Sequence, residues 1–232
     1  MSINTADLTR HNKILWTAIS TLLCVATVYT LWFGNLPLAL AISQSDWILA
    51  NKSWIETVSE FGKNGFYVLF ACLLLYGLRS YKRKLVKICQ AYVLSQLLGA
   101  FATVRILKML TGHARPQEIL ATGHFHDIWI GPTLDNAFHS FPSGHSADLF
   151  TSVIFASFLV KKIWQKAAII SFAVFMGFTR IALAEHFPYD VIAGAVIGTG
   201  ASILVVYYWL LPRLRLIDRN KSIDGESVGQ PD

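Results

Sequence analysis

Long apolar runs separated by short polar segments make up most of this 232-residue chain. The first run, Ile14 to Phe33, has 20 residues. At about 1.5 Å per residue, it is long enough to cross roughly 30 Å of hydrocarbon. Five further runs follow. Those that would form the second and fourth of the six spans need flanking residues to reach the same length. The five runs cover residues 65–78, 88–107, 146–160, 167–184 and 191–211. This pattern predicts an all-α membrane bundle of six transmembrane helices.

The segment between the first two spans, Asp46 to Gly62, has apolar residues at roughly helical spacing. They are Trp47, Ile48, Trp54, Ile55, Val58 and Phe61. This spacing predicts an interfacial helix that lies on the outer leaflet. It would either guide lipid head groups or serve as an amphipathic connector anchored by tryptophan.

Composition supports a single membrane domain. Hydrophobic residues make up 54% of the chain and charged residues 15%, and the mean hydropathy is +0.48. Six spans use nearly the whole length, which leaves no room for a separate soluble domain. We expect a cytoplasmic tail at residues 1–13, the membrane domain at 14–211 and a cytoplasmic polar tail at 212–232.

The distribution of positive charge predicts the orientation. Fourteen of the 20 Lys and Arg residues fall in the N-terminus, in the loops after the second and fourth spans, and in the C-terminal tail. The positive-inside rule places these segments, and therefore both termini, in the cytoplasm of a bacterial-type inner membrane. The net charge is +6, but the sequence has no basic stripe with interleaved aromatic residues, which would indicate nucleic-acid binding.

Three polar clusters lie at the ends of apolar runs, all on the predicted outer side. The first contains Lys108 and Arg115-Pro116, the second is Pro142-Ser143-Gly144-His145, and the third contains Arg180, His186 and Asp190. Ionisable groups at such positions are costly, so each requires a partner or a function. Three cations that would otherwise repel one another predict an anion site, and guanidinium groups are well suited to phosphate.

The second and third clusters each open a predicted helix. Ser143 can cap the fourth span, or the helix start can offer backbone N–H groups to an anion that approaches closely over Gly144. Pro188 suits the first position of the last helix, which leaves His186 outside it and Asp190 in its first turn. Asp190 would complement the helix dipole, or accept a hydrogen bond from His186 so that the other ring nitrogen can attack.

In combination, these motifs resemble the type 2 phosphatidic acid phosphatase family. The family pattern is Lys-x6-Arg-Pro, then Pro-Ser-Gly-His, then Ser-Arg-x5-His-x3-Asp. This chain matches it at every functional position from Lys108 to Asp190, except that Thr179 replaces the usual Ser. The hydroxyl group is retained, and we expect little consequence from the change.

The resemblance implies a metal-independent mechanism that needs no cofactor. His186 would attack phosphorus and form a phosphohistidine, with Asp190 orienting the ring. His145 would protonate the leaving oxygen and then activate water. The equatorial phosphate oxygens would be held by Lys108, Arg115, Ser143, Gly144 and Arg180.

Two further features lie outside the three clusters. Asp148 lies one turn after His145, where it could pair with a motif cation, contact an amino or hydroxyl group of the substrate, or complement the helix dipole. The loop from Thr111 to Phe141 also carries four histidines. They are His113, His124, His126 and His139. Their spacing fits no strong metal motif, so we expect solvated loop histidines and no metal site.

The sequence therefore predicts an integral membrane phosphatase that acts on a lipid phosphate at the outer face. Candidate substrates are phosphatidylglycerol phosphate, phosphatidic acid, polyprenyl pyrophosphate and the phosphates of lipid A. A lipid-to-lipid phosphotransferase would use the same histidine, whereas an anion or phospholipid transporter would need the cations but no nucleophile. We infer no obligate protein partner.

Overall fold

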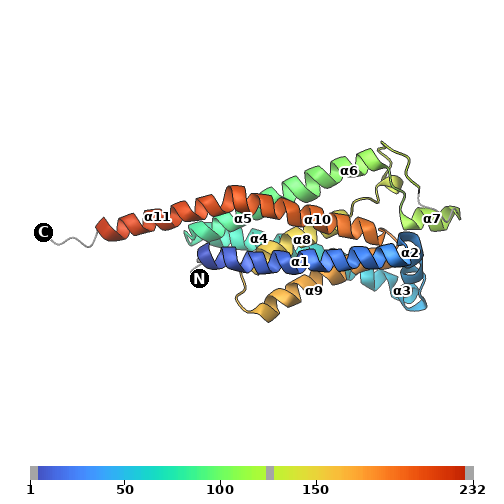
Figure 1. Ribbon diagram of the computed structural model, residues 1–232, viewed down its shortest axis with the longest axis horizontal. Coiled ribbons are helices and arrows are strands. Elements are labelled where there is room, and N and C mark those ends of the chain that lie inside the picture. The colour runs from blue at the N-terminus through green and yellow to red at the C-terminus, as the bar shows by residue number, and fades with distance from the viewer. Residues whose placement is uncertain (1–4, 124–127, 228–232) are drawn as a thin grey trace.

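The computed structural model describes residues 5–123 and 128–227, and the regular elements in these residues are helices. The longest helices run side by side along the long axis of the molecule (Figure 1). The elements are α1 (Thr5–Phe33), α2 (Asn35–Ser43), α3 (Asp46–Ala50), α4 (Lys52–Arg79), α5 (Arg83–Gln96), η1 (Leu97–Thr103), α6 (Val104–Thr111), α7 (Pro116–Thr122), η2 (Asn136–Phe138), α8 (Gly144–Ser157), α9 (Ile163–Ala182), α10 (Pro188–Val205), η3 (Val206–Leu210) and α11 (Leu211–Ser227). The all-α prediction is confirmed.

Four helical segments within the described residues are long and apolar enough to cross a membrane. They are Trp16–Phe33, Lys52–Arg79, Arg83–Thr111 and Pro188–Asn220. The other two predicted spans correspond to α8 and α9. The first has only 14 residues, and the second carries Gln165, Lys166 and Arg180. The chain is a multi-pass membrane protein, while the count of six spans stays a prediction.

The structure corrects the predicted connector helix over Asp46 to Gly62. Helix α3 ends at Ala50, and the residues from Lys52 onward form the first turns of α4. Ile55 and Ser59 are buried in these turns, so the segment packs inward and continues as one helix. The second span therefore begins well before residue 65. Helices α1 and α11 likewise extend into the segments predicted as polar tails.

Helix α8 lies at the centre of the packing, with most of its side chains buried. It packs most extensively against α10, where small residues allow the two backbones to approach closely. A Cβ added at Gly194 would lie 2.2 Å from the Ser143 carbonyl oxygen, and one at Gly198 would lie 2.2 Å from that of Ala147. The small-residue face predicted in the last span is therefore a helix-packing surface, and it fixes the start of α8 against α10.

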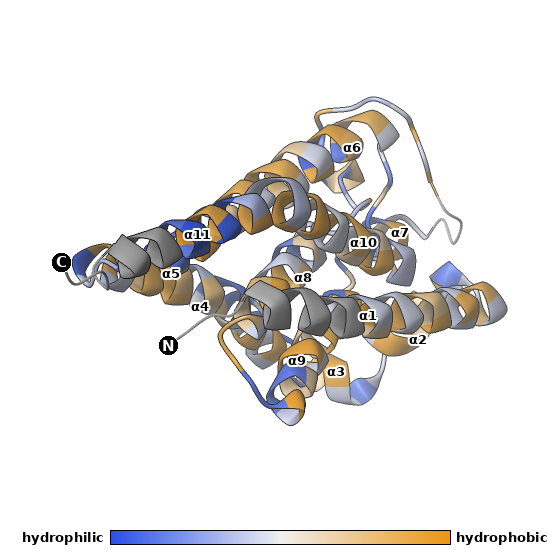
Figure 2. Ribbon diagram, turned by 60° about the vertical axis from the view of Figure 1, so that its left-hand side comes forward, coloured by the Kyte–Doolittle hydropathy of each residue, from blue (hydrophilic) through white to orange (hydrophobic). Residues whose placement is uncertain are grey.

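Large apolar side chains cover the outside of the bundle. On α1, Val28, Leu31 and Trp32 are 65%, 67% and 82% exposed, and Phe101 in η1 is 71% exposed. Figure 2 shows hydrophobic residues along most of the bundle and hydrophilic residues gathered on α11. An aqueous surface would not expose so many contiguous apolar groups, whereas a lipid-facing surface requires them.

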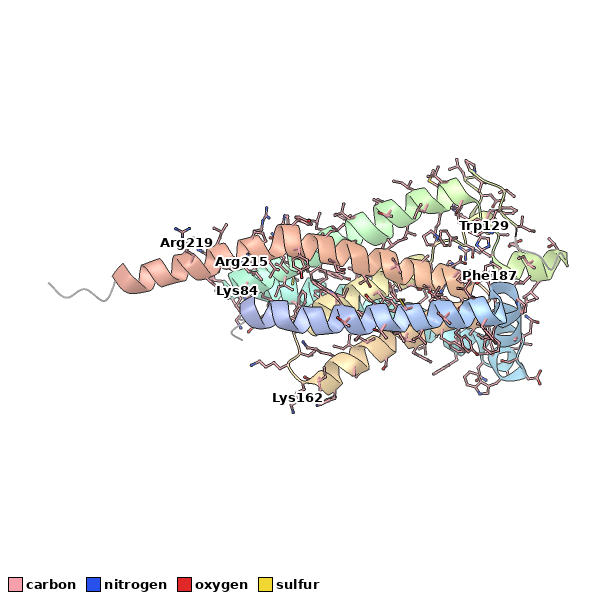
Figure 3. All side chains as sticks on the ribbon, in the orientation of Figure 1. Lys84, Trp129, Lys162, Phe187, Arg215 and Arg219 are labelled. Carbon is pink, nitrogen blue, oxygen red and sulfur yellow. The ribbon has the colours of Figure 1, made fainter. Side chains whose placement is uncertain are left out.

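The two ends of the bundle differ in their side chains. Lys84, Lys162, Arg215 and Arg219 lie toward one end, whereas Trp129 and Phe187 lie at the other (Figure 3). The beginning of α1 and the end of α11 are also found at the basic end (Figure 1). This arrangement agrees with the charge distribution from which the orientation was predicted.

Candidate active site

The three motif clusters meet at the end of the bundle opposite the basic residues. The end of α6, the start of α7 and the start of α10 lie there together (Figure 1). Hydrogen bonds and ion pairs, described below, connect residues from all three clusters. Segments more than 60 positions apart in the chain therefore form one polar site.

Two guanidinium groups from different clusters converge on one carboxylate oxygen. Nη1 of Arg115 lies 3.5 Å from Oε2 of Glu185, and Nη2 of Arg180 contacts the same oxygen. Glu185 was not predicted from the sequence, although it directly precedes His186. Carboxylate and phosphate oxygens accept hydrogen bonds from the same N–H donors. The Glu185 oxygen therefore marks a position that a phosphate oxygen can occupy.

Lys108 reaches the site from the last turn of α6. Its Nζ donates to the carbonyl oxygen of His139 and lies 3.4 Å from that of Ser140. Ser140 in turn donates through Oγ to Oδ2 of Asp190 at 2.5 Å. The ammonium group is thus held next to the third cluster by loop carbonyl groups rather than by a carboxylate.

His145 is linked to Arg180 through Glu60 of α4. Its Nε2 lies 2.8 Å from Oε1 of Glu60, and Nη1 of Arg180 lies 3.7 Å from the same oxygen. Nη1 also donates to Oγ of Ser59 at 3.0 Å. Glu60 and Ser59 were missed because they lie in the stretch interpreted as a connector. The two residues are consecutive in α4 and lie beside its contact with α9. This placement is apparent only in three dimensions.

Ser143 and Gly144 form the start of α8 as predicted. Oγ of Ser143 accepts from the backbone N–H of Ser146, and the Ser143 N–H donates to the Asp190 carbonyl oxygen at 2.9 Å. A Cβ added at Gly144 would meet only Val104, at 3.8 Å. Ser143 is therefore the helix cap, and the Gly144 backbone is not crowded at the position of a Cβ.

His186 lies just outside α10, with Pro188 at the first helical position and Asp190 in the first turn, as predicted. His186 is 3% exposed, and its Nδ1 lies 3.6 Å from Oδ2 of Asp190. That separation is longer than a hydrogen bond. Oδ2 instead accepts from Oγ of Ser140 and from the backbone N–H of Phe187 at 2.9 Å, so Asp190 also caps the helix.

The environment of His186 favours its neutral form. Burial lowers the pKa of His186 to about 4, and the cations Lys108 and Arg115 act in the same direction, whereas Asp190 opposes the shift. Burial also lowers the pKa of Arg115, against the raising effect of Asp190. At neutral pH one nitrogen of the His186 ring is therefore unprotonated.

The expectation that the loop histidines are solvated is wrong for two of them. His113 is 1% exposed and His139 is 3% exposed. Nδ1 of His113 lies 3.2 Å from Oδ1 of Asp190, and Nε2 of His139 lies 3.0 Å from the carbonyl oxygen of Thr133. The loop folds back over the third cluster, which a polar local sequence does not reveal. His124 and His126 lie outside the described residues.

Asp148 lies in α8, one turn after His145. Its carboxylate is close to the phenol of Tyr67 and to the ammonium group of Lys63, both on α4. Its backbone carbonyl accepts from Nε2 of Gln96 at 3.1 Å. The aspartate therefore faces α4.

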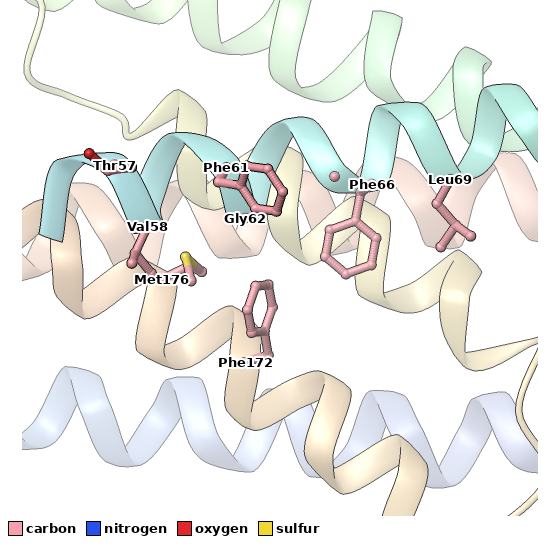
Figure 4. A pocket seen from close by; sticks show the side chains of 9 residues that line it. Thr57, Val58, Phe61, Gly62, Phe66, Leu69, Phe172 and Met176 are labelled. Atoms are coloured by element: carbon pink, nitrogen blue, oxygen red, sulfur yellow. The ribbon is translucent and has the colours of Figure 1, made fainter. Parts of the chain in front are cut away.

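A separate apolar groove of about 580 Å³ lies between α4 and α9 (Figure 4). The residues that line it are Thr57, Val58, Phe61, Gly62, Gly65, Phe66, Leu69, Phe172 and Met176. None of them belongs to the three clusters. The groove lacks the charged groups that phosphate chemistry requires, so the polar end of the bundle is the candidate active site.

Comparison with known proteins gives concordant matches. The PAP2 superfamily model matches residues 84–214. A lipid A 1-phosphatase from Rhizobium etli is 31% identical over 177 residues, which cover 68% of this chain and 72% of that protein. The bacitracin transport permease protein BcrC of Bacillus licheniformis is 33% identical over 161 residues, covering 68% of this chain and 71% of that protein. The crystal structure of Aquifex aeolicus LpxE is 27% identical, with a TM-score of 0.51, and the match covers 75% of this chain and 95% of that one.

Proposed function

The chain belongs to the PAP2 superfamily and is a membrane lipid phosphatase, and on that premise we propose that it acts through a phosphohistidine at His186. The observation that carries the proposal is the pair of guanidinium groups, from Arg115 and Arg180, on one carboxylate oxygen of Glu185, the residue that directly precedes the buried His186. Such a pair can hold two oxygens of a phosphate that His186 attacks.

In the first step, Nε2 of His186 attacks phosphorus while Nδ1, which faces Asp190, keeps its proton. The bond from phosphorus to the ester oxygen breaks, and the leaving oxygen takes a proton from His145. In the second step, His145 removes a proton from water as the water oxygen attacks phosphorus. The phosphorus–nitrogen bond then breaks, and inorganic phosphate and free His186 are released. Burial and the neighbouring Arg180 lower the pKa of His145 to about 3, and Glu60, at 2.8 Å, opposes this shift by stabilising the protonated form that the first step requires.

The cations, the Ser143 hydroxyl and the Gly144 amide would hold the equatorial oxygens during both steps. The positive end of α8 at this position supports that role. The basic residues and the candidate site lie at opposite ends of the bundle. This arrangement supports an active site on the outer face of a bacterial-type inner membrane, with both termini in the cytoplasm. In that orientation the six predicted spans, including α8 and α9, would cross the bilayer.

We propose lipid A, or a similar glycolipid phosphate, as the first substrate to test, because a relative that shares 31% identity is a lipid A 1-phosphatase. Asp148 would contact a hydroxyl or amino group of the sugar. Its position beside His145 and Tyr67 favours contact with a polar head group.

The test is a substrate panel with purified protein in micelles. Lipid A, phosphatidic acid, phosphatidylglycerol phosphate and a polyprenyl pyrophosphate are each supplied without an acceptor lipid, and inorganic phosphate is measured. We expect phosphate release with at least one lipid, resistance to EDTA, and loss to background in His186→Ala. His11→Ala, which changes the same residue type at the opposite end of the bundle, is the control. Full activity in His186→Ala would refute the proposal.

A transport function is the second candidate, because another relative is a transport permease protein. A transporter would use the cations as a binding site and would need no nucleophile. Reconstitution into liposomes separates the two functions. Substrate movement that is unaffected by His186→Ala, without phosphate release, would favour transport.

A further inference from the structure

The carboxylate of Asp190 has a closer imidazole neighbour than His186. Nδ1 of His113 lies 3.2 Å from Oδ1, whereas Nδ1 of His186 lies 3.6 Å from Oδ2. An ionised carboxylate has only acceptor sites, so a hydrogen bond between His113 and Asp190 requires the proton to be on Nδ1 of His113. The ring at position 113 is therefore the donor that fixes one of the two oxygens of Asp190.

His113 also controls the second oxygen, through Ser140. The backbone N–H of Ser140 donates to the carbonyl oxygen of His113 at 2.9 Å. The Oγ of Ser140 then donates to Oδ2 of Asp190 at 2.5 Å. These three contacts form a closed ring in which His113 sets the rotation of the Asp190 carboxylate from both sides.

The ring of His113 is itself held in place on both faces. It stacks on Trp129 at 3.9 Å between centroids with a 10° interplanar angle, and on Phe187 at 4.9 Å. Gly112 precedes it at φ +57°, and a Cβ there would lie 2.0 Å from the carbonyl oxygen of Gly131. The chain can therefore make this turn only with glycine, and the turn presents His113 to Asp190 in one orientation.

We propose that His113 is a positioning residue for phosphoryl transfer, which holds the Asp190 carboxylate so that Oδ2 faces Nδ1 of His186. This inference rests on the proposed function, because a fixed Asp190 matters to the reaction only if His186 is the nucleophile. Without the donor, Oδ1 would lose this partner, and the carboxylate, then held only through Oδ2 by Ser140 and the Phe187 N–H, could rotate about those contacts, so that His186 would lose its orientation. The cations that bind phosphate would be unaffected, so the loss should appear in kcat and not in KM.

Two substitutions separate this role from packing. His113→Phe keeps a ring that can stack on Trp129 but removes the donor, and His113→Asn offers a side-chain N–H near the position of Nδ1. A cavity of about 450 Å³ next to His113 and Asp190 gives room for the phenyl ring. We expect kcat to fall by about tenfold or more in His113→Phe, with KM within about twofold, and to recover largely in His113→Asn. Trp129→Phe, which alters the stack and keeps the donor, should retain activity.

The pH profile gives a readout that packing alone would not change. The charged groups that face His186 are Asp190 on α10, Lys108 on α6 and Arg115 at the start of α7. Removal of the His113 donor leaves the Asp190 charge less compensated, so Asp190 attracts a proton onto His186 more strongly. The acid limb of kcat/KM should then move to higher pH by about half a unit or more in His113→Phe. It should stay in place in Trp129→Phe.

The possible failures are distinguishable. A wild-type kcat in His113→Phe, with His186→Ala inactive, would overturn the role of His113 and leave the phosphatase mechanism intact. Equal losses of kcat and thermal stability in His113→Phe and His113→Asn, with an unshifted acid limb, would mean that His113 supports packing alone. Activity in His186→Ala would instead refute the proposed function itself.

Discussion

At the scale of single residues, the site contains two carboxylates that compensate its cations. Glu185 contacts both Arg115 and Arg180, and Glu60 lies between Arg180 and His145. Cations this close would repel one another without such partners. If the proposed phosphate site is correct, an entering phosphate competes with Glu185 for the two guanidinium groups.

Replacement of Glu185 by Gln tests this competition. The amide keeps an oxygen that can accept from a guanidinium group but removes the negative charge. We expect the inhibition constant for vanadate, a mimic of the phosphoryl transition state, to fall by roughly tenfold. The reason is that the negative charge at residue 185 no longer competes with the anion for the two guanidinium groups. Glu118→Gln removes the same charge from the first turn of α7 and should have a smaller effect. Weaker vanadate inhibition in Glu185→Gln would show that Glu185 organises the two arginines rather than competing with phosphate.

The residue scale also shows the limits of sequence reasoning. The motif positions around Lys108, Ser143 and His186 could be proposed from the sequence because their spacing is rigid and their side chains are chemically distinctive, and the structure brings them to one end of the bundle. His113 could not be assigned, because its burial results from the loop 128–141 folding back on it through backbone pairing at Ile128 and Ser140. Long-range contacts of this kind leave no periodic signal in the sequence.

At the scale of elements, the contact between α8 and α10 brings the second and third clusters together. Gly194 faces the Ser143 carbonyl oxygen, and the Ser143 N–H bonds to the Asp190 carbonyl oxygen. This is the point at which a helix-packing surface becomes part of the active site. Any side chain at residue 194 must separate the start of α8 from α10.

Gly194→Ala and Gly200→Ala form a matched pair on α10. A Cβ at residue 194 would clash at 2.2 Å, whereas one at residue 200 meets nothing within 4 Å. Alanine is favoured over glycine within a helix by about 1 kcal/mol, so Gly200→Ala should keep or raise thermal stability. We expect Gly194→Ala to lower both the melting temperature and kcat, the latter by tenfold or more. Equal behaviour of the two variants would show that the close contact is unnecessary for catalysis.

The elements were predictable to different degrees. Periodicity and length located each apolar run, and helices cover most of every run, although α8 ends at Ser157 and α9 at Ala182. The connector was misplaced because an amphipathic pattern from Trp54 to Phe61 fits both a helix on the membrane surface and the first turns of a span packed against protein. Only the burial of Ile55 and Ser59 distinguishes the two.

At the scale of the whole molecule, the polar candidate active site and the basic residues lie at opposite ends of an apolar bundle. The positive-inside rule then predicts which end faces the cytoplasm. Charge distribution along the sequence was sufficient to propose this orientation, because it depends on composition near span ends rather than on side-chain packing.

Cysteine labelling in intact cells tests the orientation. In a background where Cys24, Cys72 and Cys89 are replaced by alanine, single cysteines are introduced at Leu134, Lys162 or Arg219. Leu134 is 77% exposed in the loop at the site end. A membrane-impermeant maleimide should label Leu134→Cys in cells with a permeable outer envelope, and label Lys162→Cys and Arg219→Cys only after lysis. The reverse pattern would place the active site in the cytoplasm.

The central claim, that phosphate passes through His186, is tested most directly by trapping the covalent intermediate. Enzyme is mixed with a lipid carrying labelled phosphate and quenched in alkali, which preserves phosphohistidine, and the labelled peptide is identified by mass spectrometry. We expect label on His186, none in His186→Ala, and a longer-lived label in His145→Ala, where water lacks its base. Turnover in which His186 never carries the label, or in which another residue does, would contradict it.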